Sequence, residues 1–159
     1  MTSTPTVLFV CLGNICRSPL AEGAFRDLAQ QNGFKVKTDS AGTGDWHIGR
    51  APDKRAQAAA RNHGLDISDL RARQVSKQDF HLFDYIIAMD GKNLANLKRM
   101  QPKDGKAKLN LLLDYVAGKE GKSVADPYHG GADDFEKTWQ DVSTGAKALL
   151  DYIENRNKA

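Results

Sequence analysis

The chain has 159 residues and a formal net charge of +3 at pH 7, a length that predicts a single domain over residues 1–159. Its two cysteines are too few for a disulfide framework or a four-cysteine zinc site, and the small charge does not indicate nucleic acid. The longest apolar run near the start is far shorter than a membrane span, and residues 1–6 lack the basic segment of a signal peptide. We therefore expect a cytoplasmic protein that does not insert into membranes.

The first third of the chain predicts a strand, a helix, a second strand and a loop. Val7–Val10 is rich in β-branched and aromatic residues, which is typical of a buried strand. Ser18 and Pro19 form a common helix start and are followed by apolar residues at helical spacing. Phe34–Thr38 alternates as a strand does, and the glycine-rich segment Gly42–Gly49 predicts a loop.

The rest of the chain continues the alternation of helices and strands. A helix is expected after Pro52, a buried strand at Tyr85–Met89 and a helix at Asn93–Met100. Leu109–Leu113 fits a fourth strand, although it is short enough to be helical, and Phe135–Ile153 fits an amphipathic helix. This order predicts an α/β fold, with a twisted parallel sheet of about four strands and helices on both faces. Ligands of such sheets bind at the carboxyl ends of the strands.

The segment between the first strand and the first helix carries the chemistry. A tight loop at a helix N-terminus presents backbone N–H groups and positive dipole charge to one point, so Cys11 to Ser18 predicts an anion site. Gly13 permits unusual backbone geometry, and the Arg17 guanidinium can complete the cradle with a bidentate fork. Such a field favours the thiolate form of Cys11, and Ser18 is near enough in sequence to hydrogen-bond to it. A thiolate beneath a bound anion indicates attack on phosphorus.

The run Cys11 to Pro19, CLGNICRSP, with the strand before it, closely resembles the low-molecular-weight protein tyrosine phosphatases. The likeness extends from about Val7 to Glu136. Cysteine-to-arginine motifs of this kind occur in several phosphatase folds, but one near the N-terminus combined with Asp-Pro-Tyr near the C-terminus is specific to this family. The further matching segments are residues 39–43, 61–64, 72–75, 83–86, 89–90 and 126–128.

The resemblance implies hydrolysis of phosphotyrosine and small aryl phosphate monoesters through a phosphocysteine on Cys11. Arg17 would stabilise the transition state, and Asp126 would act as general acid and then as base. An acid is needed because a phenolate, whose conjugate acid has a pKa near ~10, leaves reluctantly at neutral pH. The phosphate-binding residues implied are Leu12, Gly13, Asn14, Ile15, Cys16, Arg17 and Ser18.

Four further positions have both a structural and a functional interpretation. Cys16 either fills space behind the loop or, as the resemblance implies, traps oxidised Cys11 as a disulfide. Asn14 tolerates left-handed backbone and is expected to shape the cradle. Ser40 and His63 match family positions that support the loop, although His63 also fits a histidine at a helix end.

Aromatic residues are expected to form the substrate slot. By resemblance, Trp46 and Tyr128 would line the slot that takes a phenyl ring. His129 stands where many relatives carry a second tyrosine, which leaves substrate preference open. Asp90 follows the third strand, where it either faces the crevice or caps the next helix.

Two other function classes remain as alternatives. An arsenate reductase on the same fold would need a further cysteine relay, and the chain has no cysteine beyond Cys16. A non-catalytic phosphotyrosine or oxyanion receptor would need neither Cys11 nor Asp126. The expected partners are tyrosine-phosphorylated proteins, with inorganic phosphate as product and inhibitor. No cofactor or metal is expected, and we expect a monomer.

Overall fold

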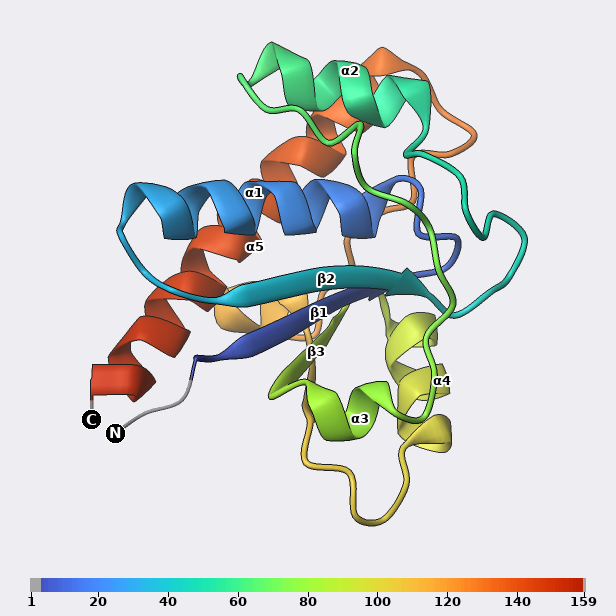
Figure 1. Ribbon diagram of the computed structural model, residues 1–159. Helices are drawn as coiled ribbons and strands as arrows, with labels where there is room; N and C mark the ends of the chain where they lie inside the picture. Colours follow the sequence, from blue (N-terminus) through green and yellow to red (C-terminus); the bar gives the residue numbers. More distant parts are fainter. Residues whose placement is uncertain (1–3, 159) are drawn as a thin grey trace.

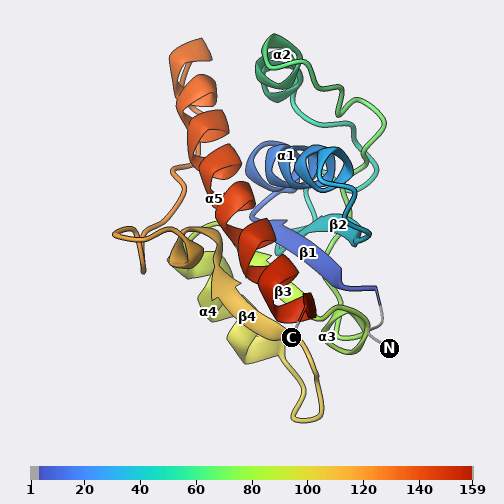
Figure 2. The ribbon, with the colours of Figure 1, turned by 90° about the vertical axis from the view of Figure 1, so that its left-hand side faces the viewer.

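Four parallel strands form the centre of the protein, in the order β2-β1-β3-β4. Figure 1 labels the first three of these, and Figure 2 also labels β4. The computed structural model describes residues 4–158; residues 1–3, part of the segment predicted to lack a signal peptide, lie outside the described residues. The strands are β1 (Thr6–Cys11), β2 (Lys37–Gly42), β3 (Tyr85–Ala88) and β4 (Lys108–Leu111). Because β1 pairs on both edges, with β2 and with β3, its carboxyl end lies in the middle of the sheet.

Helices cover both faces of this sheet. Figure 2 shows α1, α2 and α5 on one side of the strands and α3 and α4 on the other. The helices α1 (Arg17–Gln31) and α5 (Ala132–Lys158) pack together on one face, and α2 (Lys54–Asn62) lies against both of them. The short α3 (Asp79–Leu82) and α4 (Gly91–Met100) cover the other face. The predicted α/β fold with helices on both faces is confirmed.

The alternation of side chains along β1 divides the hydrophobic core in two. Successive side chains of a strand point to opposite faces, so Phe9 faces α1 and α5 while Leu8 faces α3 and α4. The Phe9 ring packs 5.5 Å from that of Phe25 on α1, and Leu8 lies in the same cluster as Phe80 and Leu97. Residues Val7 to Val10 are fully buried, as expected for a central parallel strand.

Two predicted strands differ in their bounds. The second strand was expected at Phe34–Thr38 but runs from Lys37 to Gly42, because the Phe34 N–H bonds to Ala29 O and closes α1 instead. The fourth strand ends at Leu111 and continues as a short 3-10 turn, Leu112–Tyr115. Within residues 4–158, no helix is long and apolar enough to cross a membrane.

Candidate active site

The loop Leu12–Cys16 joins β1 to α1, and its carbonyl oxygens are held from outside. Three backbone N–H donors bind them: Thr43 to Cys11 O at 2.9 Å, Gly44 to Leu12 O at 2.9 Å, and Asp53 to Ile15 O at 2.8 Å. The C=O and N–H of a trans peptide unit point in opposite directions. The N–H groups of Leu12, Gly13 and Cys16 therefore point away from these donors, toward the concave side of the loop.

Asn14 braces the loop from within. Its backbone has a φ of 60°, a left-handed conformation in which asparagine is enriched. Its side chain donates from Nδ2 to Ser18 Oγ at 2.8 Å and accepts at Oδ1 from the Arg73 N–H at 3.0 Å. The side chain is buried, so both bonds are shielded from water. Asn14 thus ties the two ends of the loop together and anchors it to the segment after α2.

The sulfur of Cys11 lies at the floor of this loop and faces two hydrogen-bond donors. The Asn14 N–H is 3.3 Å from Sγ, and Ser18 Oγ is 3.1 Å from it. Ser18 Oγ already accepts from the Asn14 amide, which leaves its own proton free to point at the sulfur. These two contacts fix the position of the sulfur at the floor of the loop.

Arg17, at the start of α1, is buried and held rigidly. Its Nη1 donates to Asp90 Oδ2 at 2.7 Å and to Val124 O at 3.0 Å, and its Nη2 lies 3.7 Å from Asp126 Oδ2. Burial disfavours the charge, but the Cys11 sulfur and the Asp90 carboxylate outweigh this and raise the pKa of Arg17 above its ordinary value. A fixed guanidinium next to the sulfur is a preorganised partner for an oxyanion.

Asp90 connects the site to the end of β3. It caps α4, where its Oδ1 accepts from the Asn93 N–H at 2.8 Å, while its other oxygen binds Arg17. Asp90 therefore both faces the crevice, where it binds Arg17, and caps the next helix, α4.

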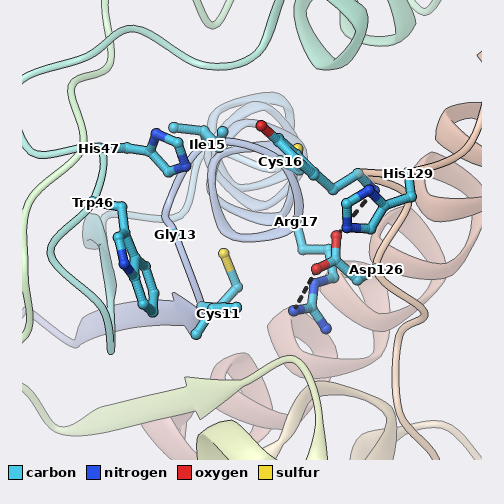
Figure 3. Close-up of a pocket in the computed structure, with 11 residues that line it drawn as sticks. Cys11, Gly13, Ile15, Cys16, Arg17, Trp46, His47, Asp126 and His129 are labelled. Carbon is cyan, nitrogen blue, oxygen red and sulfur yellow. Dashed lines mark hydrogen bonds and ion pairs between the residues drawn. The ribbon is translucent and has the colours of Figure 1, made fainter.

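A pocket of about 270 Å³ opens above the sulfur (Figure 3). Trp46 and His47 lie on one side of Cys11, and Asp126 and His129 lie on the other. The Asp126 side chain is 44% exposed, so it can reach both the pocket and solvent. The lining residues are Cys11, Leu12, Gly13, Ile15, Cys16, Arg17, Trp46, His47, Asp126, Tyr128 and His129.

Comparisons of sequence and of structure with known proteins assign this chain to the same family. The family model described as low molecular weight phosphotyrosine protein phosphatase matches residues 6–159. The chain belongs to this family. The family and the enzyme class predicted from the residues around Cys11 are therefore confirmed.

Several relatives cover almost the whole phosphatase. The low molecular weight protein-tyrosine-phosphatase YfkJ of Bacillus subtilis is 46% identical over 155 residues, 96% of this chain and 98% of that protein. The crystal structure of YfkJ superposes with a TM-score of 0.90 and covers 98% of each chain. The human low molecular weight phosphotyrosine protein phosphatase is 44% identical, over 94% of this chain and 96% of that protein. A structure titled drosophila arginine phosphatase is 35% identical, covers 92% of this chain and 96% of that chain, and has a TM-score of 0.87.

Cys16, the second thiol of the phosphatase, lies in the pocket lining but is itself buried. Burial, together with the negative charges of Asp53 and Cys11, raises the pKa of Cys16 well above its ordinary value. The raised pKa disfavours the Cys16 thiolate, so Cys16 does not compete with Cys11 for the phosphorus of a substrate. Both cysteines are free thiols.

Ser40 and His63, expected to support the loop, lie elsewhere. Ser40 is buried on β2 beside the carboxylate of Glu22. His63 Nε2 is 2.9 Å from Glu136 Oε1, and its ring stacks on Trp139 at 4.8 Å, so it joins α2 to α5. Within the described residues, neither side chain makes a hydrogen bond to the loop Leu12–Cys16. We therefore leave both out of the site proposed below.

His47 was missed as a site residue. Its ring packs so closely on the loop that a Cβ at Gly13 would come 2.9 Å from His47 Cδ2. Its Nδ1 is buried without a hydrogen-bond partner in the part of the chain that the structure describes. The available signal was positional, since His47 follows Trp46 in the loop after β2, at the carboxyl edge of the sheet.

Proposed function

We propose that this phosphatase hydrolyses phosphotyrosine and small aryl phosphate monoesters through a phosphocysteine on Cys11. The observation that carries the proposal is the position of the Cys11 sulfur. It lies on the floor of the pocket, faces the Ser18 hydroxyl and the Asn14 N–H, and has Arg17 and Asp126 beside it. A protein that only binds a phosphorylated ligand needs neither a cysteine sulfur nor a carboxyl group next to the bound phosphate, but this pocket contains both, Cys11 and Asp126.

In the first step, the Cys11 thiolate attacks phosphorus, a P–S bond forms and the P–O bond to the phenol breaks. The N–H groups of the loop and the Arg17 guanidinium bind the three equatorial oxygens, whose charge is greatest in the transition state. Asp126, in its protonated form, gives its proton to the leaving oxygen so that a neutral phenol departs.

In the second step, the Asp126 carboxylate takes a proton from a water molecule as that water attacks the phosphocysteine. The P–S bond breaks, inorganic phosphate forms, and the sulfur leaves as a thiolate. The Ser18 hydroxyl supports this departure because, at 3.1 Å from the sulfur, it can donate a hydrogen bond to the thiolate that forms. Inorganic phosphate is therefore expected both as product and as competitive inhibitor.

The proposed slot for the substrate ring lies between the side chains that rise above the pocket. Trp46 is 65% exposed and Tyr128 is 40% exposed, so their faces are available to a flat ring. His129 lies edge-on to Tyr128, with the ring centroids 5.1 Å apart. Because one relative is named an arginine phosphatase, the phosphorylated residue has to be tested directly.

The decisive experiment compares the wild type with Cys11→Ser and Asp126→Asn. Rapid-mixing kinetics with p-nitrophenyl phosphate should show a burst of phenol release in the wild type and no turnover in Cys11→Ser. Asp126→Asn should slow the hydrolysis of phenyl phosphate, whose phenol is a poor leaving group, much more than the hydrolysis of p-nitrophenyl phosphate. Turnover by Cys11→Ser near the wild-type rate would contradict the nucleophile, and equal slowing of both substrates would contradict the acid.

Peptides that carry phosphotyrosine, phosphoserine or phosphoarginine at one matched position then test the slot. We expect the highest kcat/KM for phosphotyrosine, with a smaller preference in Trp46→Ala. A higher kcat/KM for phosphoarginine would reassign the substrate while leaving the chemistry of Cys11 intact.

We further propose that Cys16 protects Cys11 from irreversible oxidation. Peroxide converts the Cys11 thiolate to a sulfenic acid, and the Cys16 thiol then displaces water to give a disulfide. Burial of both sulfurs in one pocket supports this role. The arsenate reductase alternative lacks support, because the chain has only these two cysteines.

We also propose that residues 1–159 act as one catalytic domain, as a cytoplasmic monomer whose substrates are tyrosine-phosphorylated proteins. The match of one family model to residues 6–159 supports the single domain, and membership of a phosphotyrosine protein phosphatase family supports the substrates.

A further inference from the structure

The segment that carries Asp126 forms a turn, in which the Gly130 N–H binds Pro127 O at 2.8 Å and the Gly131 N–H binds Asp134 Oδ2 at 2.9 Å, but these bonds do not hold the Asp126 carboxylate itself. Residues 126–131 form no regular element before α5 begins, and among the residues that the structure describes the Asp126 carboxylate accepts a single hydrogen bond, from the N–H of Tyr128 at 3.1 Å. Within residues 4–158, its one charged partner from another element is Arg17 Nη2, 3.7 Å away, a long contact at a half-exposed side chain. An acid held this loosely needs support from elsewhere if it is to meet a leaving group.

Arg55, near the start of α2, contacts this segment at several points. Its Nη1 donates to Gly130 O at 3.0 Å. Its guanidinium lies over the Phe135 ring, 4.6 Å from the centroid, and 5.6 Å from the centroid of Tyr128. Cation–π contacts of this kind contribute modestly at partly exposed sites, but here they add to a directed hydrogen bond. Arg55 therefore contacts the acid segment at Tyr128 and Gly130, and also contacts Phe135 in the first turn of α5.

Asp53 fixes the other side of Arg55. The pair is bidentate, with Nε–Oδ1 and Nη2–Oδ2 distances of 3.0 Å, and Asp53 Oδ1 also accepts the Arg55 backbone N–H at 2.8 Å. These bonds hold the pKa of Asp53 below its usual range. The Asp53 N–H in turn binds Ile15 O, in the loop beneath the substrate phosphate. A continuous path thus runs from the phosphate loop through Asp53 and Arg55 to the acid segment.

We infer that Arg55, held by Asp53, is a positioning residue that sets the height of Asp126 above the Cys11 sulfur. The inference rests on the proposed acid role of Asp126. Ile15 and Gly130 are 115 positions apart in the sequence, yet the N-cap residue of α2 and the side chain of Arg55 connect them, through the Asp53 N–H at one end and Arg55 Nη1 at the other. Without Arg55, the segment loses its bond at Gly130, and Asp126 is free to move toward its remaining partner, Arg17. The acid would then meet the leaving oxygen less often, while the phosphate loop would stay intact.

The test measures the burst rate constant for phosphorylation of Cys11 with a series of aryl phosphates of increasing leaving-group pKa. In Arg55→Ala we expect about tenfold slower phosphorylation for the poorest leaving group, which corresponds to about 1.4 kcal/mol, and little change for the best one. The inhibition constant of inorganic phosphate should change less than about twofold. Arg55→Lys keeps the charge but cannot form the bidentate pair and the Gly130 bond together, so it should restore part of the rate.

Three controls separate the possible outcomes. Arg61→Ala removes an exposed arginine from the same helix and should leave every rate unchanged. Asp53→Asn keeps the helix cap but weakens the pair with Arg55, so it should reproduce a smaller version of the Arg55→Ala effect even if Arg55→Ala folds poorly. Thermal unfolding monitors the fold of each variant.

Asp126→Asn, measured in parallel, distinguishes the two proposals. If Asp126→Asn steepens the dependence on the leaving group and Arg55→Ala does not, the inference about Arg55 is wrong while the acid role stands. If Asp126→Asn leaves the dependence unchanged, the acid role itself fails. An equal loss for all leaving groups in Arg55→Ala, together with weaker phosphate inhibition, would show a purely structural role and overturn the inference.

Discussion

Replacement of Asp90 tests how far one carboxylate organises the site. Asp90 has two separable jobs, since one oxygen pairs with Arg17 at 2.7 Å and the other caps α4 through the Asn93 N–H. Asp90→Asn keeps the cap, because asparagine caps helices as well as aspartate does, but removes the charge. Asp90→Ala removes both.

The magnitudes follow from the burial of the two partners. Breaking a fully buried ion pair costs about 3–5 kcal/mol, and we expect a smaller cost here, about 2–3 kcal/mol, because Asp90 is 24% exposed while Arg17 is 3% exposed. Loss of the cap adds about 1 kcal/mol. Asp90→Asn should therefore destabilise the fold by about 2–3 kcal/mol and Asp90→Ala by about 3–4 kcal/mol.

Urea unfolding at pH 7 measures these free energies, and the inhibition constant of phosphate reports on Arg17 in the same variants. Saturating phosphate should narrow the gap between wild type and Asp90→Asn, because the bound anion gives Arg17 a new partner. Ordinary surface substitutions change the free energy of unfolding by no more than about 0.5 kcal/mol. If both variants unfold with free energies this close to that of the wild type, Asp90 does not neutralise a buried charge.

Three other substitutions test the loop and its surroundings. Gly42→Ala would place a Cβ 2.7 Å from Leu12 O, so kcat/KM should fall at least tenfold, as steady-state kinetics would show; an unchanged value would mean that the loop yields freely. After mild peroxide treatment, thiol should restore less activity in Cys16→Ser than in the wild type, and equal recovery would remove the protective role. Burial raises the pKa of Glu22 in the folded state, so the charged carboxylate costs stability above that pKa and costs nothing below the unfolded value of about 4.3. Glu22→Gln should therefore raise the unfolding midpoint at pH 8 but not at pH 4, and a gain at pH 4 as large as that at pH 8 would contradict the assignment.

The sequence predicted the site best where the chemistry is local. Cys11 ends β1, and Arg17 and Ser18 begin α1, so the prediction of one strand, one short loop and one helix start was enough to bring the three residues together. The bounds of β2 were harder to predict. Its carboxyl half, Asp39–Gly42, has small residues with weak strand preference, and it is a strand because β1 pairs with it and the loop leaves no room for larger side chains.

Contacts between distant segments could not be predicted from one sequence. Arg73 illustrates this, because its N–H binds Asn14 Oδ1 while its guanidinium pairs with Asp39 and Asp79. Nothing in its local pattern distinguishes it from an exposed arginine. The sequence left His63 with two interpretations, support of the loop or a helix end. In the structure it caps α2 at its C-terminal end, and its ring packs against Glu136 and Trp139 on α5.

The central place of β1 in the sheet has a consequence for the synthesis of this protein. The nucleophile lies on β1, and this strand obtains its second neighbour in the sheet only when β3, which follows β2 and α2 in the chain, has been made. Asp126 and the helix that covers this face follow later still. A nascent chain therefore carries its reactive sulfur for most of translation without the carboxylate and the closed pocket. The pocket is therefore complete only after the residues that carry Asp126 and α5 have been made.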